Sequence, residues 1–278
     1  MAVGFRTLLA DEVARQLPTQ LVANYIANRD YEDDAKLQAG QSVVVNVVGA
    51  PTVQNATGEI DYTTGSTDTV TVNIDQFKTA PDKISDLEKI QSSAGLRQGR
   101  VDASIRALAN DEDGYIIGKI VDGVTVANTI GTVAAPVDCT TFAKAIGVLR
   151  NLKTKCDKND VPLDGRTVVC PPEFENLLLS DTSAAQALAA TITEKDESAV
   201  AVGYIGKLLG FRIFRSNNIN DSTILATHSV LNTMIDQFNG IKWFTDKDNP
   251  TVEFFTPLNL YGAGVVRPVS AKAIVSFQ

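Results

Sequence analysis

The spacing of apolar residues changes several times along the chain, and each change predicts a different element. Apolar residues at helical spacing run from Asp11 to Asn28 and are interrupted by Pro18, which predicts two short amphipathic helices. These could pack as an ordinary helix pair or form an arm that docks on a neighbouring molecule. The acidic cluster that follows lacks the glycine and the ligand spacing of a calcium loop, so a solvated turn is expected. It comprises Asp30, Glu32, Asp33 and Asp34.

Residues 37–77 are rich in Val, Thr, Gly and Asn, and their apolar positions alternate along the chain. The run Val43–Val45 and the alternation at Val70, Val72 and Ile74 predict a long β-hairpin. Its tip is polar and rich in turn residues, so it offers little to bury. Because an isolated two-stranded hairpin is at best marginally stable, this one must lie on another surface.

A long amphipathic helix is predicted after the hairpin. Ser85 and Glu88 have the spacing of a capping box, which predicts a helix start, while Gly95 and Gly99 predict a break or a close backbone approach. The apolar stripe that follows predicts a rod of about twenty residues, or roughly 30 Å. It comprises Val101, Ile105, Leu108, Tyr115, Ile116 and Ile120. The stripe alone is also compatible with a central core helix.

From Thr140 onward helices and strands are predicted to alternate, as in an α/β domain. The predicted elements are a helix over Phe142–Leu152, a strand over Arg166–Cys170, a helix opened by Pro171 and Pro172, a mobile segment or weak helix over Asp181–Ala199, a short helix over Ile205–Leu209 ended by Gly210, and a strand over Phe211–Arg215. After Trp243 the chain returns to β structure. The fold class is therefore α+β.

Composition and charge exclude some classes of protein. The chain has 278 residues, with 25 basic and 33 acidic side chains and a net charge of −8. This charge has the wrong sign for a protein that coats nucleic acid by neutralising phosphates. No apolar run approaches the roughly 18 residues of a membrane helix, and the first residues lack the apolar core of a secretory signal. A soluble, intracellular protein is expected.

The residue types that carry most catalysis and metal binding are scarce. Cys139, Cys156 and Cys170 are odd in number and contain no CxxC pairing, and His228 is the only histidine. A zinc site, a catalytic triad and a disulfide framework are therefore not expected, and His228 is assigned a structural or surface role. The glycines around Gly206 do not have the spacing of a phosphate-binding loop. We expect no metal, no cofactor and no catalytic residues.

Three stretches, in this order, resemble the major capsid proteins of tailed bacteriophages, whose Hong Kong-type fold is shared with herpesvirus capsids and encapsulins. The stretches are Asn28–Glu32 leading to Gly40–Val43, then Asp160–Glu173, where a turn, a strand and a proline-opened helix follow in succession, and Gly203–Asn218. The hairpin, the long helix and the β segment near Tyr261–Gly264 fall in the same order as in that family. The resemblance covers most of the chain.

The resemblance implies a phage major-capsid fold of four parts. These are an N-terminal arm over residues 1–36, an extended β-hairpin loop over 37–82, a peripheral domain with a long spine helix over 83–137 and 241–278, and an α/β axial domain over 138–240. It also implies a structural protein and not an enzyme. Such a protein forms pentamers and hexamers of an icosahedral or prolate shell in the virion, assembles in the host cytoplasm, and encloses double-stranded DNA without sequence-specific binding.

The chain departs from part of the family pattern. Some members weld their shells by an isopeptide bond from a lysine in the extended loop, but no Lys or Arg occurs between Lys36 and Lys78. Covalent cross-linking is therefore not expected. The sequence begins almost directly with the arm, so a separate scaffolding protein and a portal are expected as partners.

Opposite charges suggest how neighbouring subunits are held together. The stretch between Lys36 and Lys78 carries four acidic residues and no base, and three arginines lie near the start of the spine helix. We expect these to meet between subunits, although the arginines could merely solvate a helix face. The candidate contact residues are Glu59, Asp61, Asp68, Asp75, Arg97, Arg100 and Arg106.

Two other functions remain as alternatives. The first is an encapsulin-like bacterial compartment, which uses the same fold to enclose a cargo. The second, from a different class, is a soluble hydrolase built from the acidic cluster and His228, with Ser229 or Asp236 close by in the sequence. Nothing in the sequence supplies a nucleophile elbow or a second histidine for it.

Overall fold

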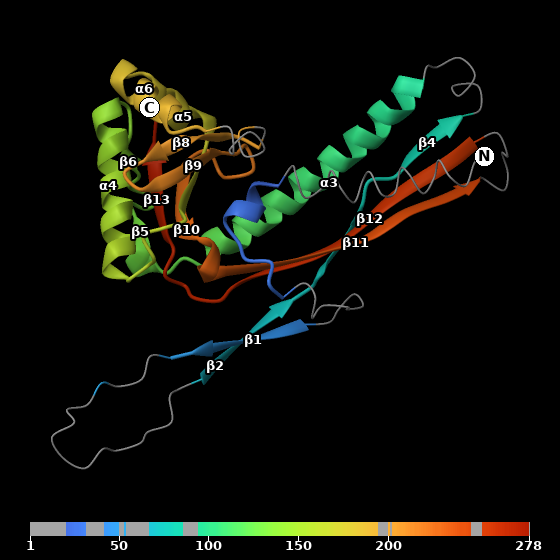
Figure 1. Ribbon diagram of the computed structural model, residues 1–278, viewed down its shortest axis with the longest axis horizontal. Helices are drawn as coiled ribbons and strands as arrows, with labels where there is room; N and C mark the ends of the chain where they lie inside the picture. The colour runs from blue at the N-terminus through green and yellow to red at the C-terminus, as the bar shows by residue number, and fades with distance from the viewer. Residues whose placement is uncertain are drawn as a thin grey trace, which may run out of the picture.

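The computed structural model describes residues 21–31, 42–49, 53, 67–85, 94–193, 200, 202–245 and 252–277. It has an α/β part around a seven-stranded sheet and an elongated part in which a long helix lies along a second sheet (Figure 1). A two-stranded hairpin projects away from both. The predicted α+β class is confirmed.

The sheet of the α/β part has the strand order β5-β13-β10-β7-β9-β8, and β6 pairs with β13. Its strands are β5 (Thr129–Ile130), β6 (Val137–Asp138), β7 (Arg166–Cys170), β8 (Tyr204–Leu208), β9 (Phe211–Arg215), β10 (Thr223–His228) and β13 (Ala271–Ser276). Strand β7 is fully buried, as its run of apolar residues predicted. The predicted strands over Arg166–Cys170 and Phe211–Arg215 are confirmed.

Both faces of this sheet are covered, so neighbouring residues of one strand enter different cores. Val168 packs with helices α4 (Phe142–Lys158), α5 (Pro172–Leu179) and α6 (Thr182–Ala190), whereas Val169 packs on the side of the long helix. The predicted helices after Thr140 and at Pro172 are confirmed. Part of the segment expected to be mobile or weakly helical, Asp181–Ala199, forms α6, whose first turn is capped by the Asp181 side chain. Residues 194–199 lie outside the described residues.

The helix predicted over Ile205–Leu209 is wrong, because these residues belong to strand β8 and to the turn after it. Leu208 pairs with Phe211 across a two-residue turn in which Leu209 and Gly210 both have positive φ, at 53° and 90°. Two such residues make a turn whose twist suits a β-hairpin. The glycine that we interpreted as a helix stop is therefore a hairpin turn residue.

The elongated part is built on helix α3 (Ala94–Asp122), which has 29 residues and a length of about 43 Å. It lies along β12 (Val252–Val265), which pairs with β11 (Asn232–Thr245) on one edge and with β3 (Gln76–Thr79) and β4 (Asp82–Ser85) on the other. The predicted rod-like helix is confirmed. The predicted break is wrong, because α3 is continuous and a Cβ on Gly99 would meet no atom within 4 Å.

The predicted hairpin is confirmed in its described residues, where β1 (Ser42–Val48) pairs antiparallel with β2 (Thr67–Asn73). The root of this hairpin packs on the β11–β12 sheet through a small separate core. That core comprises Val43, Val45, Val72, Ile74, Ile235 and Leu260. Beyond the root the hairpin projects away from the body (Figure 1).

The N-terminal segment is described only over residues 21–31, so most of the two predicted helices lie outside the described residues. What is described is one 3-10 turn, η1 (Val22–Tyr25), flanked by the fully buried Leu21 and Ile26. Asn28 pairs with Thr233 as an isolated bridge to β11. In the part of the chain that is described, no helix has the length and apolar character needed to span a membrane.

The chain passes from one part to the other after α3, after β10 and after β12. Strand β10 continues through η4 (Ser229–Leu231) into β11, and the chain returns from β12 to β13, which pairs with β10. Residues 271–276, placed by sequence with the peripheral segment 241–278, thus belong to the sheet of the α/β part. Strand β11, in turn, begins at Asn232, inside the range 138–240.

Candidate functional site

One turn in the middle of α3, Asp111–Tyr115, holds together the N-terminal segment, the second sheet and the root of the hairpin. Four of its five side chains make hydrogen bonds to residues distant in sequence. We call it the polar turn. Because these bonds reach η1, β12 and the root of the hairpin, this turn fixes the relative positions of the three.

Asp113 holds the N-terminal segment. Its two carboxylate oxygens accept hydrogen bonds from the backbone N–H groups of Val22 and Ala23, each at 3.0 Å. Burial raises the pKa of Asp113 to about 6, and the two N–H bonds offset part of that rise. This side chain satisfies donors of η1 that have no partner within the 3-10 turn.

Asp111 and Glu112 bind the second sheet. Tyr261 Oη donates to Asp111 Oδ2 at 2.5 Å, and Asn259 Nδ2 donates to Glu112 Oε2 at 2.8 Å. Burial and the Asp111 carboxylate raise the pKa of Tyr261. Both partners lie on the same face of β12, since they are two residues apart, so this face is the one that α3 covers.

Tyr115 reaches the root of the hairpin, where its hydroxyl donates to Asp75 Oδ1 at 2.6 Å. Partial burial acts to raise the pKa of Asp75, but the hydrogen bonds from Tyr115 and Gln76 outweigh it and lower that pKa below its usual value. Asp75 was predicted to contact a neighbouring subunit. Its described partners lie in its own chain.

The structure separates the other predicted contact residues. Asp68 is exposed on β2, and Glu59 and Asp61 lie outside the described residues. In the single chain the hairpin and the start of α3 point in different directions (Figure 1). A contact between Asp68 and the start of α3 would therefore join two copies.

The arginines near the start of α3 differ in their surroundings. Arg100 donates to the Lys83 carbonyl oxygen at 2.5 Å and lies 3.6 Å from Asp82, both in its own strand β4. Arg106 is exposed and follows it by six residues, so the two lie on different sides of the helix. The side chain of Arg97 lies outside the described residues.

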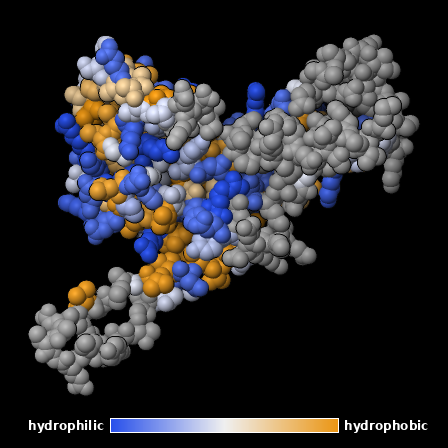
Figure 2. All heavy atoms as spheres, viewed as in Figure 1, coloured by the Kyte–Doolittle hydropathy of each residue, from blue (hydrophilic) through white to orange (hydrophobic). Residues whose placement is uncertain are grey.

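The outward face of the hairpin is an uncharged surface of Val, Thr and Asn side chains. Val44 is 55% exposed and Val48 is 67% exposed, and they lie opposite Thr71 and Thr67 in the ladder. Figure 2 shows apolar residues gathered where the hairpin leaves the body. An exposed β surface of this kind is suited to cover by another chain.

His228 has the structural role expected from its isolation in the sequence. Its Nδ1 accepts from the Val230 N–H at 3.1 Å, so Nε2 carries the proton and donates to the Asp164 carbonyl oxygen at 2.7 Å. Asp236, its suggested partner in a hydrolase, instead forms an ion pair with Arg29 at 3.3 Å. Of the acidic cluster, only Asp30 is described.

The three cysteines are buried and do not pair with one another. Burial raises the pKa of the Cys139 and Cys156 thiols to about 11 and that of Cys170 further still. Protonated, enclosed thiols are poor nucleophiles and poor metal ligands. Over the described ranges, no three His, Cys, Asp or Glu side chains gather in a way that could hold a metal ion.

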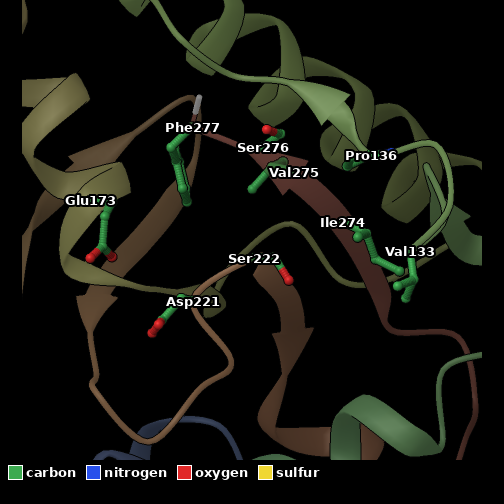
Figure 3. Close-up of a pocket in the computed structure, with 9 residues that line it drawn as sticks. All are labelled: Val133, Pro136, Glu173, Asp221, Ser222, Ile274, Val275, Ser276 and Phe277. Atoms are coloured by element: carbon green, nitrogen blue, oxygen red, sulfur yellow. The ribbon is translucent and has the colours of Figure 1, made fainter.

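A cavity of about 490 Å³ lies at the end of β13 (Figure 3). Its wall is mainly apolar, with Val133, Ile274 and Phe277, and the carboxylates of Glu173 and Asp221 lie at one side. The residues that line it include no histidine, cysteine or lysine. Both carboxylates are exposed, so the cavity has no enclosed acid–base pair.

Sequence reasoning missed the polar turn. The stripe at Tyr115 and Ile116 was interpreted as one apolar face, and the acids at 111, 112 and 113 were not considered. The available signal was three consecutive acids inside a long amphipathic helix, of which two are buried. Buried carboxylates require hydrogen-bond partners, so such a run indicates contacts with other elements.

Comparison with known proteins gives one family match. A family model described as phage capsid protein matches residues 82–270, which include α3, every strand of the α/β sheet except β13, and the β11–β12 pair. No curated protein matches the chain.

Solved structures are similar over nearly the whole chain. A structure from Mycobacterium phage Che8 has a TM-score of 0.69 and 25% identity, covering 91% of this chain and 90% of that one. The capsid structure of cyanophage P-SCSP1u has a TM-score of 0.68 and 14% identity, covering 93% and 89%. A virus-like particle from Pyrococcus furiosus has a TM-score of 0.59 and 12% identity, covering 98% and 99%. The described fold is the one seen in these structures.

Proposed function

The chain belongs to the phage capsid protein family, and we propose that its copies assemble as pentamers and hexamers into a closed icosahedral or prolate shell around double-stranded DNA. As a major capsid protein it is a structural component of the virion. The observation that carries the proposal beyond the family is the β1–β2 hairpin, which projects from the body and exposes an uncharged face that includes Val44 and Val48.

A neighbouring copy is the natural partner for this hairpin. Among its described residues, those at the root are buried within the chain, and a two-stranded ribbon on its own is marginal in water. Every subunit of a closed shell presents the same hairpin and the same receiving surface. One kind of contact, repeated around the shell, would cover all of these faces.

Charge favours the start of α3 as part of the receiving surface. The stretch between Lys36 and Lys78 carries Glu59, Asp61, Asp68 and Asp75 without a base, whereas Arg97, Arg100 and Arg106 lie on α3. Arg100 would bridge its own Asp82 and an acid of the neighbour. Each exposed pair contributes only about 0.2–1 kcal/mol, but the contact is repeated in every copy.

The remaining features of the proposal follow the same architecture. Residues 1–36 serve as an arm, 37–82 as the extended loop, the α3 region with β11 and β12 as the peripheral domain, and the α/β sheet as the axial domain. The net charge of −8 suits a shell lining that does not grip phosphates. A separate scaffolding protein and a portal act during assembly in the host cytoplasm, and the subunit has no catalytic role.

An encapsulin-like compartment is the second candidate, favoured by the likeness to the Pyrococcus furiosus particle. The two candidates differ in what the shell contains. A phage shell encloses a genome delivered through a portal, whereas a compartment encloses protein cargo.

The test is to produce the full chain with and without the genes that flank it and to analyse the particles. Sedimentation and electron microscopy should reveal closed shells, and particles from infected cells should contain DNA that resists nuclease until they are opened. Closed shells that never contain DNA but retain a co-purified protein would favour the compartment. A chain that stays monomeric under all conditions would contradict both.

A further inference from the structure

Glu112 is a fully buried carboxyl group with an incomplete set of partners. Its side chain is 0% exposed, Oε2 accepts from Asn259 Nδ2, and Oε1 has no hydrogen-bond partner. Asn259 is equally buried, and its Oδ1 atom also has no partner. Loss of hydration would strongly destabilise an ionised carboxylate enclosed in this way.

The groups that face Glu112 do not offer a cation to balance its charge. Asp113 is its neighbour on α3, Asp236 faces it from β11, and Asn259 and Tyr261 face it from β12. Arg29, from the N-terminal segment, is the nearest cation among the groups that act on it, and it is engaged with Asp236 at 3.3 Å. Lys78 on β3 pairs with Asp111.

We propose that Glu112 is a neutral carboxylic acid in the folded chain and that its proton makes a hydrogen bond that holds α3 on the β11–β12 sheet. We call this protonated carboxyl group the latch. A protonated Oε1 becomes a donor in a site rich in acceptors, among which the Asp236 carboxylate is the charged group that acts on Glu112 most strongly. The negative charge of the site is then carried by Asp236 and balanced by Arg29. The latch joins the helix, the sheet and the N-terminal segment.

The electrostatics agree with this assignment. Burial raises the pKa of Glu112 from the usual 4.5 to about 9, with the Asp236 carboxylate as the next contribution. The folded chain therefore holds this proton at pH values where the unfolded chain has released it. Stability falls as pH rises from about 4.5 to about 9, and the equilibrium constant for unfolding rises by up to tenfold per pH unit in that window.

The direct test is infrared spectroscopy of the full chain at pH 7.5, where ordinary carboxyl groups are ionised. The wild-type chain should show the carbonyl stretch of a protonated carboxylic acid, and Glu112→Gln should lack it. The exposed control Glu173→Gln should keep it. Identical spectra for wild type and Glu112→Gln would overturn the proposal.

A titration keeps the test decisive should Glu112→Gln fail to fold. In the wild-type chain the band should disappear as pH is raised, with a midpoint near 9, and Asp236→Asn should move that midpoint down by removing the anionic neighbour. If the wild type has no such band, and EDTA destabilises it while Ca²⁺ restores it, a bound cation occupies the site and the latch proposal is wrong. These spectra do not depend on assembly, so absence of the band would contradict the latch proposal and not the proposed shell. A chain that shows the band but stays monomeric would contradict only the proposed shell.

Discussion

A Cβ atom on Gly262 would lie only 2.3 Å from the carbonyl oxygen of Asn73, so β2 crosses β12 in direct backbone contact. The next glycine on the same face, Gly264, would place a Cβ 2.6 Å from Val72 Cγ2. The two glycines thus form a seat on which the root of the projecting hairpin lies. The direction of the hairpin depends on this close approach.

Gly262→Ala should displace the hairpin root, because the obstructing atom is backbone and cannot rotate away. We expect a loss of about 1–3 kcal/mol in the free energy of unfolding and impaired shell assembly. Chemical denaturation and electron microscopy measure the two effects. Gly99→Ala, on a helix position with no atom within 4 Å, is the control and should stabilise by roughly 0.5–1 kcal/mol. Normal assembly of Gly262→Ala would show that the close approach of β2 to this glycine is not needed for assembly.

Asp113→Asn should release the N-terminal segment, because an amide can accept only one of the two N–H bonds that the carboxylate accepts and presents its own donors to the other. The expected loss is about 1–3 kcal/mol. Amide hydrogen exchange of Val22 and Ala23 should accelerate, whereas the exposed control Asp122→Asn on the same helix should leave it unchanged. Unchanged protection in Asp113→Asn would show that the segment is held by its other contacts and not by Asp113.

Much of the architecture could be predicted from local pattern. The 3.6-residue stripe through Val101 and Ile120 gave the long helix, and alternation at Val70 and Val72 gave the hairpin, because one periodicity dominated each segment. The same reasoning gave the wrong element for Ile205–Leu209, which belong to a strand and a turn. Their apolar residues suit a helix as well as a strand, and the left-handed conformation of Leu209 that decides the matter is not encoded by residue type.

The three consecutive acids indicate that the polar turn contacts other elements, but its partners could not be predicted because they are distant in sequence. Tyr261 and Asn259 lie about 150 residues beyond α3, and only the folded sheet brings them to Asp111 and Glu112. The pairing of β13 with β10 is equally non-local. For this reason the domain boundary predicted at residue 241 assigns β13 to the peripheral domain, although β13 belongs to the sheet of the α/β part.

Reversing charge in the extended loop should impair assembly without unfolding the chain. Glu59→Lys combined with Asp61→Lys should keep a normal circular dichroism spectrum yet form fewer shells. Arg97→Glu should restore part of the loss, and rescue by Arg100→Glu should be weaker because Arg100 also binds its own β4. High salt should mimic the defect in the wild type, since the Debye length falls to roughly 3 Å at 1 M.

The control for this charge reversal is Asp122→Lys combined with Asp164→Lys, which changes the net charge equally at exposed sites elsewhere. It should assemble normally. If the loop variant assembles as well as this control at low salt, the loop acids do not contribute to the contact.

Shells of this protein should be held without covalent cross-links. The part of the extended loop over residues 37–77 contains no lysine, and the three thiols are buried and protonated near neutral pH. Boiling mature particles in detergent and reductant should therefore release single chains of 29.7 kDa on a denaturing gel. A ladder of linked oligomers would show a cross-link that uses other residues.

The central claim, that the projecting hairpin is completed by a neighbouring copy in a closed shell, is tested most directly by a three-dimensional electron-microscopy reconstruction of the assembled particles. We predict pentamers and hexamers in which the β1–β2 hairpin of each subunit lies across an adjacent subunit and its Val44 and Val48 face is covered. A reconstruction in which the hairpin folds back on its own chain, or remains bare in a closed shell, would contradict the account.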